Sequence, residues 1–334
     1  MIKFFREFHP HTLRIIALAI VLMLTILFFA SQIDGYFSPR MLNRIATSVA
    51  VILPIAIGQA MVVISRNIDL SVGSIVGISA YLIGDYLGTH PDIHPVIVVG
   101  MALALGSLCG AINGALVAYG RIPSIIVTLG TLALFRTYLV EYSGARSITT
   151  SGLPQWLVDL PQRTIFSIGS FDMRLTVAMS LVAAIVFWVA LSRLRVARKL
   201  YAVGSNPDAA IIAGINSSLV VFVSFVLSGM LAGLAGFMFL AKFGNITVVA
   251  GLGFELKSVA AVVVGGVNIF GGSGSIIGVV IGTVLVDTID NSLTRWAIVS
   301  EFWREALLGM LIMIAVATDT FMARSFGRMK GKTK

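Results

Sequence analysis

Charge is scarce in this chain of 334 residues. Only 12% of the residues are Asp, Glu, Lys or Arg, whereas 57% are hydrophobic. A soluble domain carries about 25% charged residues and about 45–50% apolar ones. So little charge cannot cover the surface of a water-soluble body of this size, which excludes soluble enzymes and soluble nucleic-acid-binding proteins. The composition instead predicts a protein that folds inside a lipid bilayer.

Cysteine and histidine are also rare, with one Cys and four His in the chain. Cys109 lies in the apolar run 96–118, so the sequence supports neither a disulfide framework nor a cysteine metal site. No His-Glu-x-x-His motif or similar ligand spacing occurs, and we expect no metal site. Because no paired-carboxylate loop is present either, we predict no catalytic residues and no cofactor bound by this chain itself.

Long apolar runs recur along the whole sequence, each close to the roughly 20 residues that a helix needs to cross a bilayer. They predict an all-α polytopic membrane protein with about ten transmembrane helices, within a range of eight to ten. Residues 1–334 then form a single transmembrane domain. The predicted spans are 13–30, 45–64, 70–88, 95–118, 124–140, 174–192, 219–241, 258–270, 274–290 and 304–320.

Basic residues indicate how the chain is oriented. Ten spans place both termini on one side, and the segments on that side hold 14 of the 24 Lys and Arg residues. The excess is concentrated at 193–199 and in the basic tail 321–334, so we expect both termini in the cytoplasm. The net charge of +9 is then an orientation signal, and nucleic acid is not an expected partner. The longest external loop is predicted at 141–173.

Glycine, in contrast, is abundant and regularly spaced. Small residues four apart form stripes that let helix backbones approach closely in a membrane. The stripes are Gly106, Gly110 and Gly114; Gly274, Gly278 and Gly282; Gly73 and Gly77; and Gly229 and Gly233. We interpret them mainly as helix-packing surfaces, with a moving pore interface as the alternative.

The sequence also predicts an internal repeat. Residues 67–77 match residues 268–278 at six of eleven positions, 201 residues apart. Gly-interrupted apolar segments that recur in two halves of a membrane protein point to a transport pathway.

Polar side chains interrupt the spans at a few places. In the break at 67–71, Asp69 or Ser71 can cap the following helix, with Arg66 near enough to neutralise Asp69; otherwise the break is a re-entrant element lining a path. The amides Gln59 and Asn113 can either join helices or bond a polyhydroxylated solute. Asp287 and Asp290 are expected near hydrated outer span ends. The candidate path residues are Gln59, Asn67, Asp69, Ser71, Asn113, Thr128 and Asn268.

The segment 193–218 predicts a short helix outside the membrane. Ser205 or Asn206 can serve as its N-cap, followed by Pro207 at the first helical position and Asp208 in the first turn. Gly214 then supplies a left-handed stop. Spacing alone leaves two roles open, a connector and a docking helix for a cytoplasmic partner.

Four motifs together resemble the ribose-type sugar ABC importer permeases, in the family's order and over nearly the whole chain. They are NIDLSVGS at 67–74, IPSIIVTLGT at 122–131, YAVGSNPDAA at 201–210 and GGSGSIIG at 271–278. Residues 66–69 are most similar to the branch that serves rhamnose, autoinducer-2 and pentoses.

This resemblance implies a permease subunit of the bacterial inner membrane that moves a monosaccharide or a similar small neutral polyhydroxylated solute. The implied partners are a periplasmic solute-binding protein, cytoplasmic ATPase subunits that bind ATP-Mg, and a second permease subunit in a homo- or heterodimer. The loop 141–173 then becomes periplasmic, and 193–218 becomes a coupling loop. Its positions that match the family are Gly204, Asn206, Pro207, Asp208, Ala209, Ala210 and Gly214.

An ion-coupled secondary transporter of a small polar solute is the alternative. That mechanism favours ionisable groups near the middle of the membrane, whereas the acidic residues here are expected at the edges of spans.

Overall fold

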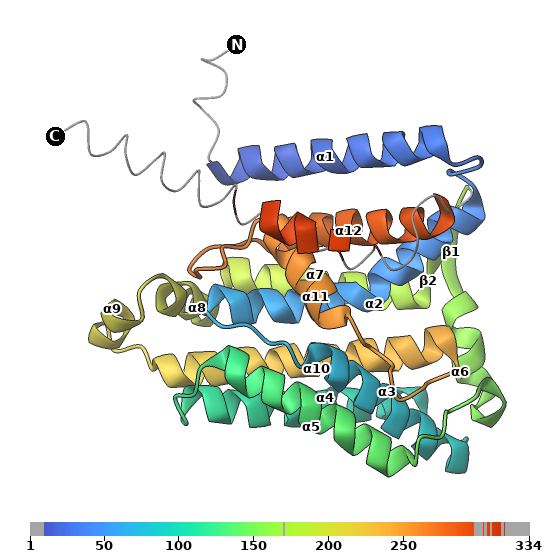
Figure 1. The fold of residues 1–334 in the computed structure, drawn as a ribbon, viewed down its shortest axis with the longest axis horizontal. Coiled ribbons are helices and arrows are strands. Elements are labelled where there is room, and N and C mark those ends of the chain that lie inside the picture. Colours follow the sequence, from blue (N-terminus) through green and yellow to red (C-terminus); the bar gives the residue numbers. More distant parts are fainter. Residues whose placement is uncertain are drawn as a thin grey trace.

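Long helices lie side by side through most of the computed structural model (Figure 1). The structure describes residues 10–169, 171–296, 303, 306–307, 309–314 and 317, so the predicted tail at 321–334 lies outside the described residues. The longer helices are α1 (Pro10–Gln32), α2 (Pro39–Ile64), α3 (Val72–Thr89), α4 (Pro95–Ala118), α5 (Ser124–Ser143), α7 (Leu175–Arg193), α10 (Ser217–Phe243) and α12 (Ile276–Trp296). Shorter elements are α6 (Gln155–Asp159), β1 (Thr164–Ile168), β2 (Phe171–Arg174), α8 (Arg195–Ser205), α9 (Pro207–Ile212), α11 (Phe254–Val264) and 3₁₀ turns at Thr150–Gly152 and Leu160–Gln162.

The predicted all-α polytopic class is confirmed. Within the described residues, seven helices are long and apolar enough to cross a membrane, namely α1, α2, α4, α5, α7, α10 and α12. The predicted span 70–88 corresponds to α3, which has 18 residues. The predicted span 304–320 falls largely outside the described residues.

The predicted span at 258–270 is wrong. α11 has only 11 residues, which at about 1.5 Å per residue gives about 17 Å, roughly half of the hydrocarbon core. The helix ends because Gly266 adopts φ +85°, a left-handed conformation that terminates helices and suits glycine. Val267 and Ile269 continue the apolar run past this break, so composition alone does not reveal it.

Helix α2 lies at the centre of the bundle, and 89% of the residues in its most apolar 18-residue stretch are buried. Helix α1 lies on the outside, and only 6% of the residues in its corresponding stretch are buried. α10 packs against α4, α2 and α3. A Cβ atom on Gly106 or Gly110 of α4 would overlap the backbone of α10. A Cβ atom on Gly282 of α12 would overlap the backbone of α11, and one on Gly278 would overlap Gly265, the residue that follows α11. The predicted glycine packing is therefore confirmed at both helix pairs.

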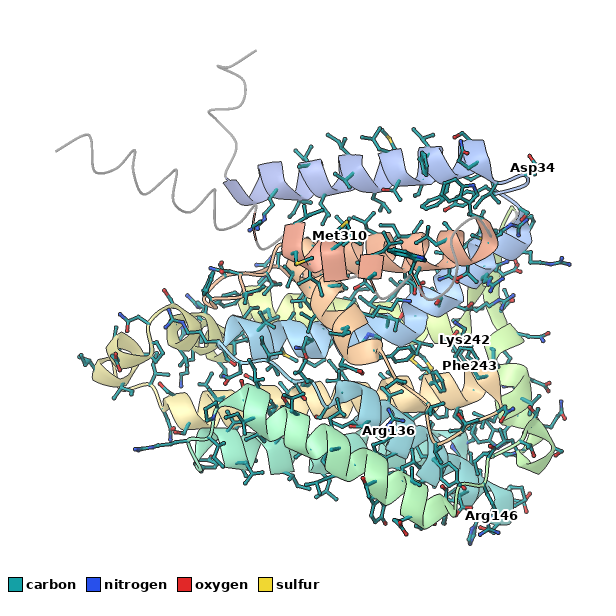
Figure 2. All side chains as sticks on the ribbon, viewed as in Figure 1. Asp34, Arg136, Arg146, Lys242, Phe243 and Met310 are labelled. Carbon is teal, nitrogen blue, oxygen red and sulfur yellow. The ribbon has the colours of Figure 1, made fainter. Side chains whose placement is uncertain are left out.

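The two ends of the bundle carry different structures. α8 and α9 project from one end, where α1 begins and α2 ends, while α6 and the β1–β2 hairpin lie at the other (Figure 1). In the hairpin Ser167 pairs with Asp172, whose backbone N–H donates to Asn43 of α2 at 3.1 Å. Asp34 and Arg146 lie at this same end (Figure 2). The segment predicted as an external loop is thus a series of short elements between α5 and α7.

The helix breaks at the start of the two halves of the predicted repeat share one local structure, in which Asn67 corresponds to Val267 rather than to the predicted Asn268. After α2 and after α11, a backbone N–H donates to the carbonyl five residues earlier, from Asn67 at 3.0 Å and from Val267 at 3.1 Å. The preceding residue is left-handed in both places, with φ +67° at Arg66 and +85° at Gly266. The two helix breaks, 200 residues apart, therefore close in the same way.

Candidate functional site

Between α2 and α3 the chain leaves helical geometry at residues 65–71. Asp69 and Ser71 are fully buried in this stretch. Asp69 Oδ1 accepts hydrogen bonds from the backbone N–H of Ser71 at 3.0 Å and from its hydroxyl at 2.6 Å. Asp69 Oδ2 accepts from Ser228 Oγ of α10 at 3.4 Å. The carboxylate thus stabilises an irregular backbone, which at membrane depth has to face protein or water.

Neighbouring helices complete this polar cluster. Asn113 of α4 donates from Nδ2 to Ser71 Oγ at 2.7 Å. Gln59 of α2, once its amide is turned to match its neighbours, bonds the backbone N–H and C=O of Asp69 at 3.2 and 3.0 Å. Thr128 of α5 donates to a backbone carbonyl of the unwound stretch at 3.3 Å. Five of the seven predicted path residues therefore meet in one place.

Most hydrogen-bonding groups of the cluster are used within the chain. The side chains of Gln59, Asp69, Ser71, Asn113 and Thr128 are all buried, and their contacts join α2, α3, α4 and α5. Asn113 Oδ1 is the exception, because it has no hydrogen-bond partner among the described residues. A buried acceptor left unpaired costs about 1–3 kcal/mol. It is therefore a favourable point of contact for a hydroxyl donor, while a transport role for the cluster stays a prediction.

The other two predicted path residues lie in the repeated helix breaks. Asn67 Nδ2 donates to the carbonyl two residues earlier at 2.9 Å, and Asn268 Oδ1 accepts from the amide two residues later at 3.0 Å. Each of these side chains thus stabilises the backbone of the loop in which it lies. The expected pairing of Arg66 with Asp69 is wrong, since the Arg66 guanidinium turns to backbone carbonyls outside the cluster.

The short helix predicted within 193–218 is present as α9. Asn206, rather than Ser205, is its N-cap, and Asn206 Oδ1 accepts from the backbone N–H three residues later at 3.0 Å. Pro207 occupies the first turn with Asp208, and Gly214 follows with φ +75°. The local structure is confirmed, and docking on an ATPase stays a prediction.

α9 lies at the end of the bundle (Figure 1) and carries exposed apolar residues. Ile211 is 60% exposed and Ile212 is 88% exposed, whereas Ala210 is buried. Two adjacent isoleucines in water form a small apolar surface that a partner protein could cover.

α8 joins α9 to both repeated helix breaks. Gly204 lies so close to the carbonyl of Ile64 and the amide of Gly272 that a Cβ atom would overlap both. The Arg66 guanidinium donates to the carbonyl of the last residue of α8 and to a carbonyl in the loop 265–275, both at 2.9 Å. One arginine therefore connects the first helix break, the second helix break and the predicted coupling segment.

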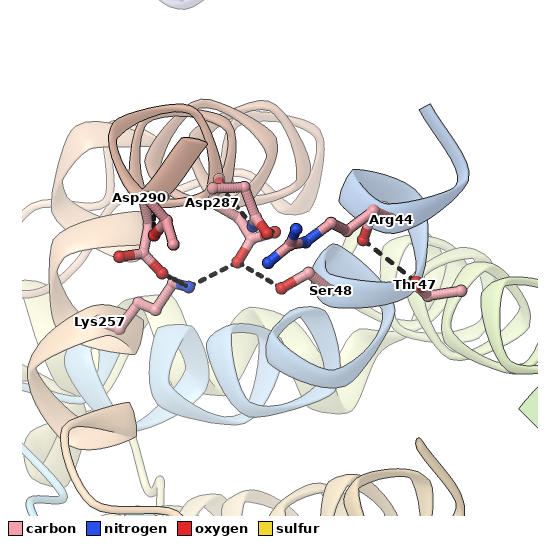
Figure 3. Close-up of polar contacts among 8 residues, drawn as sticks. Arg44, Thr47, Ser48, Lys257, Asp287 and Asp290 are labelled. Carbon is pink, nitrogen blue, oxygen red and sulfur yellow. Dashed lines mark hydrogen bonds and ion pairs between the residues drawn. The ribbon is translucent and has the colours of Figure 1, made fainter. Parts of the chain in front are cut away.

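A buried ion cluster, which the sequence did not suggest, lies between α11, α12 and α2 (Figure 3). Lys257 Nζ lies 2.5 Å from Asp287 Oδ1 and 2.7 Å from Asp290 Oδ2. Ser48 Oγ and Asn291 Nδ2 also donate to Asp287, at 3.1 and 2.9 Å. Asp287 is fully buried near the middle of α12, so its expected position at a hydrated span end is wrong. In the sequence, only the presence of two aspartates, Asp287 and Asp290, three residues apart in an apolar run indicated that such a cluster could form.

Known proteins match this chain over most of its length. Residues 41–316 match the family described as branched-chain amino acid transport system / permease component. The autoinducer 2 import system permease protein LsrC of Escherichia coli O157:H7 is 35% identical over 315 residues, covering 94% of this chain and 88% of that protein. LsrC of Salmonella paratyphi B is 33% identical over 304 residues, covering 91% and 85%. No solved structure matches the chain.

These matches confirm the resemblance to ribose-type importer permeases that the four motifs carry. The matched residues run from the first turn of α2 past the end of α12, and so include the polar cluster, both helix breaks and the α8–α9 segment. The chain is a transport component rather than an enzyme, and a multi-pass protein of the inner membrane. It belongs to the ABC importer permeases of the branched-chain amino acid transport system / permease component family.

Proposed function

We propose that this permease carries a monosaccharide, or a similar small neutral polyhydroxylated solute, from a periplasmic binding protein into the cytoplasm. The relatives from Escherichia coli and Salmonella are named for autoinducer 2 import. Autoinducer 2 is therefore the first solute to test, followed by rhamnose and ribose.

The observation that carries the proposal is the continuous contact from the exposed α9 to the buried polar cluster. α9 follows α8 directly, and Gly204 near the end of α8 contacts the end of α2. Arg66 ties α8 to the start of the unwound stretch 65–71, which contains Asp69 and Ser71. Because this stretch lacks the regular hydrogen bonds of a helix, it is the part that a push on α9 displaces most easily. Closure of ATPase subunits bound at α9 would thereby rearrange the cluster.

The chemistry of the cluster suits a neutral solute. Amides and hydroxyls predominate, from Gln59, Asn113, Thr128 and Ser71, and the single carboxylate, Asp69, is bonded within the chain. The free Oδ1 of Asn113 offers an acceptor to a solute hydroxyl. Such groups replace water around a sugar without holding it as firmly as fixed charges would.

We orient the α8–α9 end toward the cytoplasm because four basic residues gather at 193–199. ATPase subunits, which carry ATP-Mg, would bind at this end. The binding protein would deliver solute at the hairpin end. A second permease subunit, either another copy or a different chain, would complete the translocation path.

Uptake into proteoliposomes tests this function. The chain is reconstituted with its ATPase subunits, and labelled autoinducer 2, rhamnose and ribose are offered with and without ATP and the binding protein. We expect uptake of one of them to require both. Uptake of solute by the chain alone, driven by a proton or sodium gradient, would contradict the proposal.

One observation favours the ion-coupled alternative, namely the buried Asp287 near the middle of α12. Ionisable groups at such depth are functional candidates. Both carboxylate oxygens of Asp287 are, however, bonded to Lys257, Ser48 and Asn291. Gradient-driven uptake by the native chain that is lost in the Asp287→Asn variant would favour ion coupling. ATP-driven uptake that the Lys257→Met, Asp287→Asn double variant retains would favour the importer.

A further inference from the structure

A largely apolar cavity of about 260 Å³ lies between α7, α8 and α10, beside Met61 of α2. Its walls include Phe187, Leu191, Val223 and Leu227. A smaller apolar cavity, of about 150 Å³, already stays dry and admits benzene in another protein. This cavity is therefore suited to hydrocarbon rather than to water or a sugar.

Three polar residues line the cavity, and two of them are occupied. Ser224 Oγ donates to the carbonyl of Val220 at 2.8 Å, and Asn216 Oδ1 caps α10 by accepting from the amide of Leu219 at 3.0 Å. The third is Lys199 of α8, which is exposed. In the part of the chain that the structure describes, the Lys199 ammonium has no hydrogen bond or ion pair. A positive charge without a counter-ion thus stands beside an apolar cavity.

The charged residues of α7 and α8, two of the helices that form the cavity, are all basic. Residues 193–199 carry four exposed basic side chains, and residues 175–207 contain no Asp or Glu. Val196 and Leu200 of α8 line the cavity together with Lys199, while Arg195 and Arg198 do not. A helix with one basic and one apolar face lies in the membrane interface, and basic pockets between transmembrane helices at the cytoplasmic side bind anionic headgroups.

From this juxtaposition we propose that the cavity binds an acyl chain of an anionic phospholipid whose phosphate pairs with Lys199. Leu194 and Val223 are 53% and 40% exposed, so lipid can enter the cavity from the bilayer. Because the cavity is lined by α7, α8 and α10, a bound lipid would hold α8 against the other two helices. Gly204, which contacts the helix breaks, lies on this same α8. The ligand is a membrane lipid, and its binding does not depend on which solute is transported.

Native mass spectrometry of the purified full chain tests the proposal. Phosphatidylglycerol and phosphatidylcholine with identical acyl chains are supplied in equal amounts, and we expect phosphatidylglycerol to be retained preferentially. Lys199→Gln should weaken phosphatidylglycerol binding about fivefold, the contribution of one basic residue at an anionic surface. Arg121→Gln removes another exposed basic residue on the predicted cytoplasmic side that does not line the cavity, and should leave binding unchanged.

A second pair of variants fills the cavity instead of changing its charge. Val223→Trp, and the milder Ala190→Leu, should lower retention of both lipids. Elution as a single species and an unchanged thermal midpoint identify the variants that remain folded. Equal retention of the two lipids by the native chain would overturn the proposal, as would phosphatidylglycerol retention that is the same in the native chain, Lys199→Gln and Ala190→Leu.

Discussion

Replacing Lys257 by methionine should destabilise the protein by about 3–5 kcal/mol. Asp287 is fully buried, and Lys257 is the cation within hydrogen-bond distance of it in the described residues. Without that cation the carboxylate keeps only the neutral donors Ser48 and Asn291. Breaking a buried ion pair costs about 3–5 kcal/mol because the remaining charge is uncompensated. Arg44 points toward the same carboxylate (Figure 3), so we expect a value near 3 kcal/mol.

The double variant Lys257→Met, Asp287→Asn separates charge from packing. Removing both charges leaves no fully buried uncompensated ion, because Asp290, the other partner of Lys257, is 21% exposed and can be hydrated, and such replacements are often nearly neutral. We therefore expect the double variant to recover most of the lost stability, to within about 1 kcal/mol of the native chain. Asp290→Asn is the matched control, because the Asp290 side chain is 21% exposed and should cost less than about 1 kcal/mol.

Unfolding in mixed micelles with a rising fraction of dodecyl sulfate measures these free energies. The reasoning is refuted if Lys257→Met unfolds within about 1 kcal/mol of the native chain, or if the double variant is less stable than Lys257→Met alone. In the reconstituted importer, ATP-driven uptake by the folded double variant should stay close to native, since the ion cluster is assigned a structural role.

Three further predictions concern the contact between α9 and the helix breaks. Gly204→Val should abolish uptake while ATP hydrolysis continues, because its side chain would overlap the carbonyl of Ile64; tightly coupled uptake in this variant would argue against the contact. Ile212→Asp should weaken association with the ATPase about tenfold in a titration, since it places a charge on an exposed apolar surface; unchanged affinity would exclude α9 as the docking helix. Arg66→Met should speed hydrogen exchange in α8 by removing two hydrogen bonds, and exchange equal to native would show that the guanidinium does not hold α8.

Local patterns in the sequence predicted local structure well. Asn206, Pro207 and Gly214 specify a capped short helix through interactions within a few residues, and the structure has that helix. Glycines four apart marked the α4–α10 and α11–α12 contacts, because only a missing side chain allows such close packing.

Contacts between distant residues were harder to predict. Lys257 and Asp287 lie 30 residues apart on different helices, and their pairing depends on how α11 packs on α12. The sequence predicts a span that ends at residue 290, close to Asp287, whereas α12 continues to Trp296 and has Asp287 near its middle. The direction of the Arg66 side chain was missed for a similar reason, as its partners in α8 and the loop 265–275 are remote in sequence.

The two repeated helix breaks have the same hydrogen bonding but different residues at the left-handed position. Gly266 adopts this conformation freely, whereas Arg66 with a side chain has to bear about 1–2 kcal/mol of steric strain. The hydrogen bonds of its guanidinium to α8 and to the loop 265–275 offset that strain only while α8 stays in place. The helix break in the first half of the permease thus holds backbone strain at Arg66, whereas the break in the second half, at Gly266, holds none. Motion that withdraws α8 would be assisted by release of this strain, so the two halves need not open with equal ease.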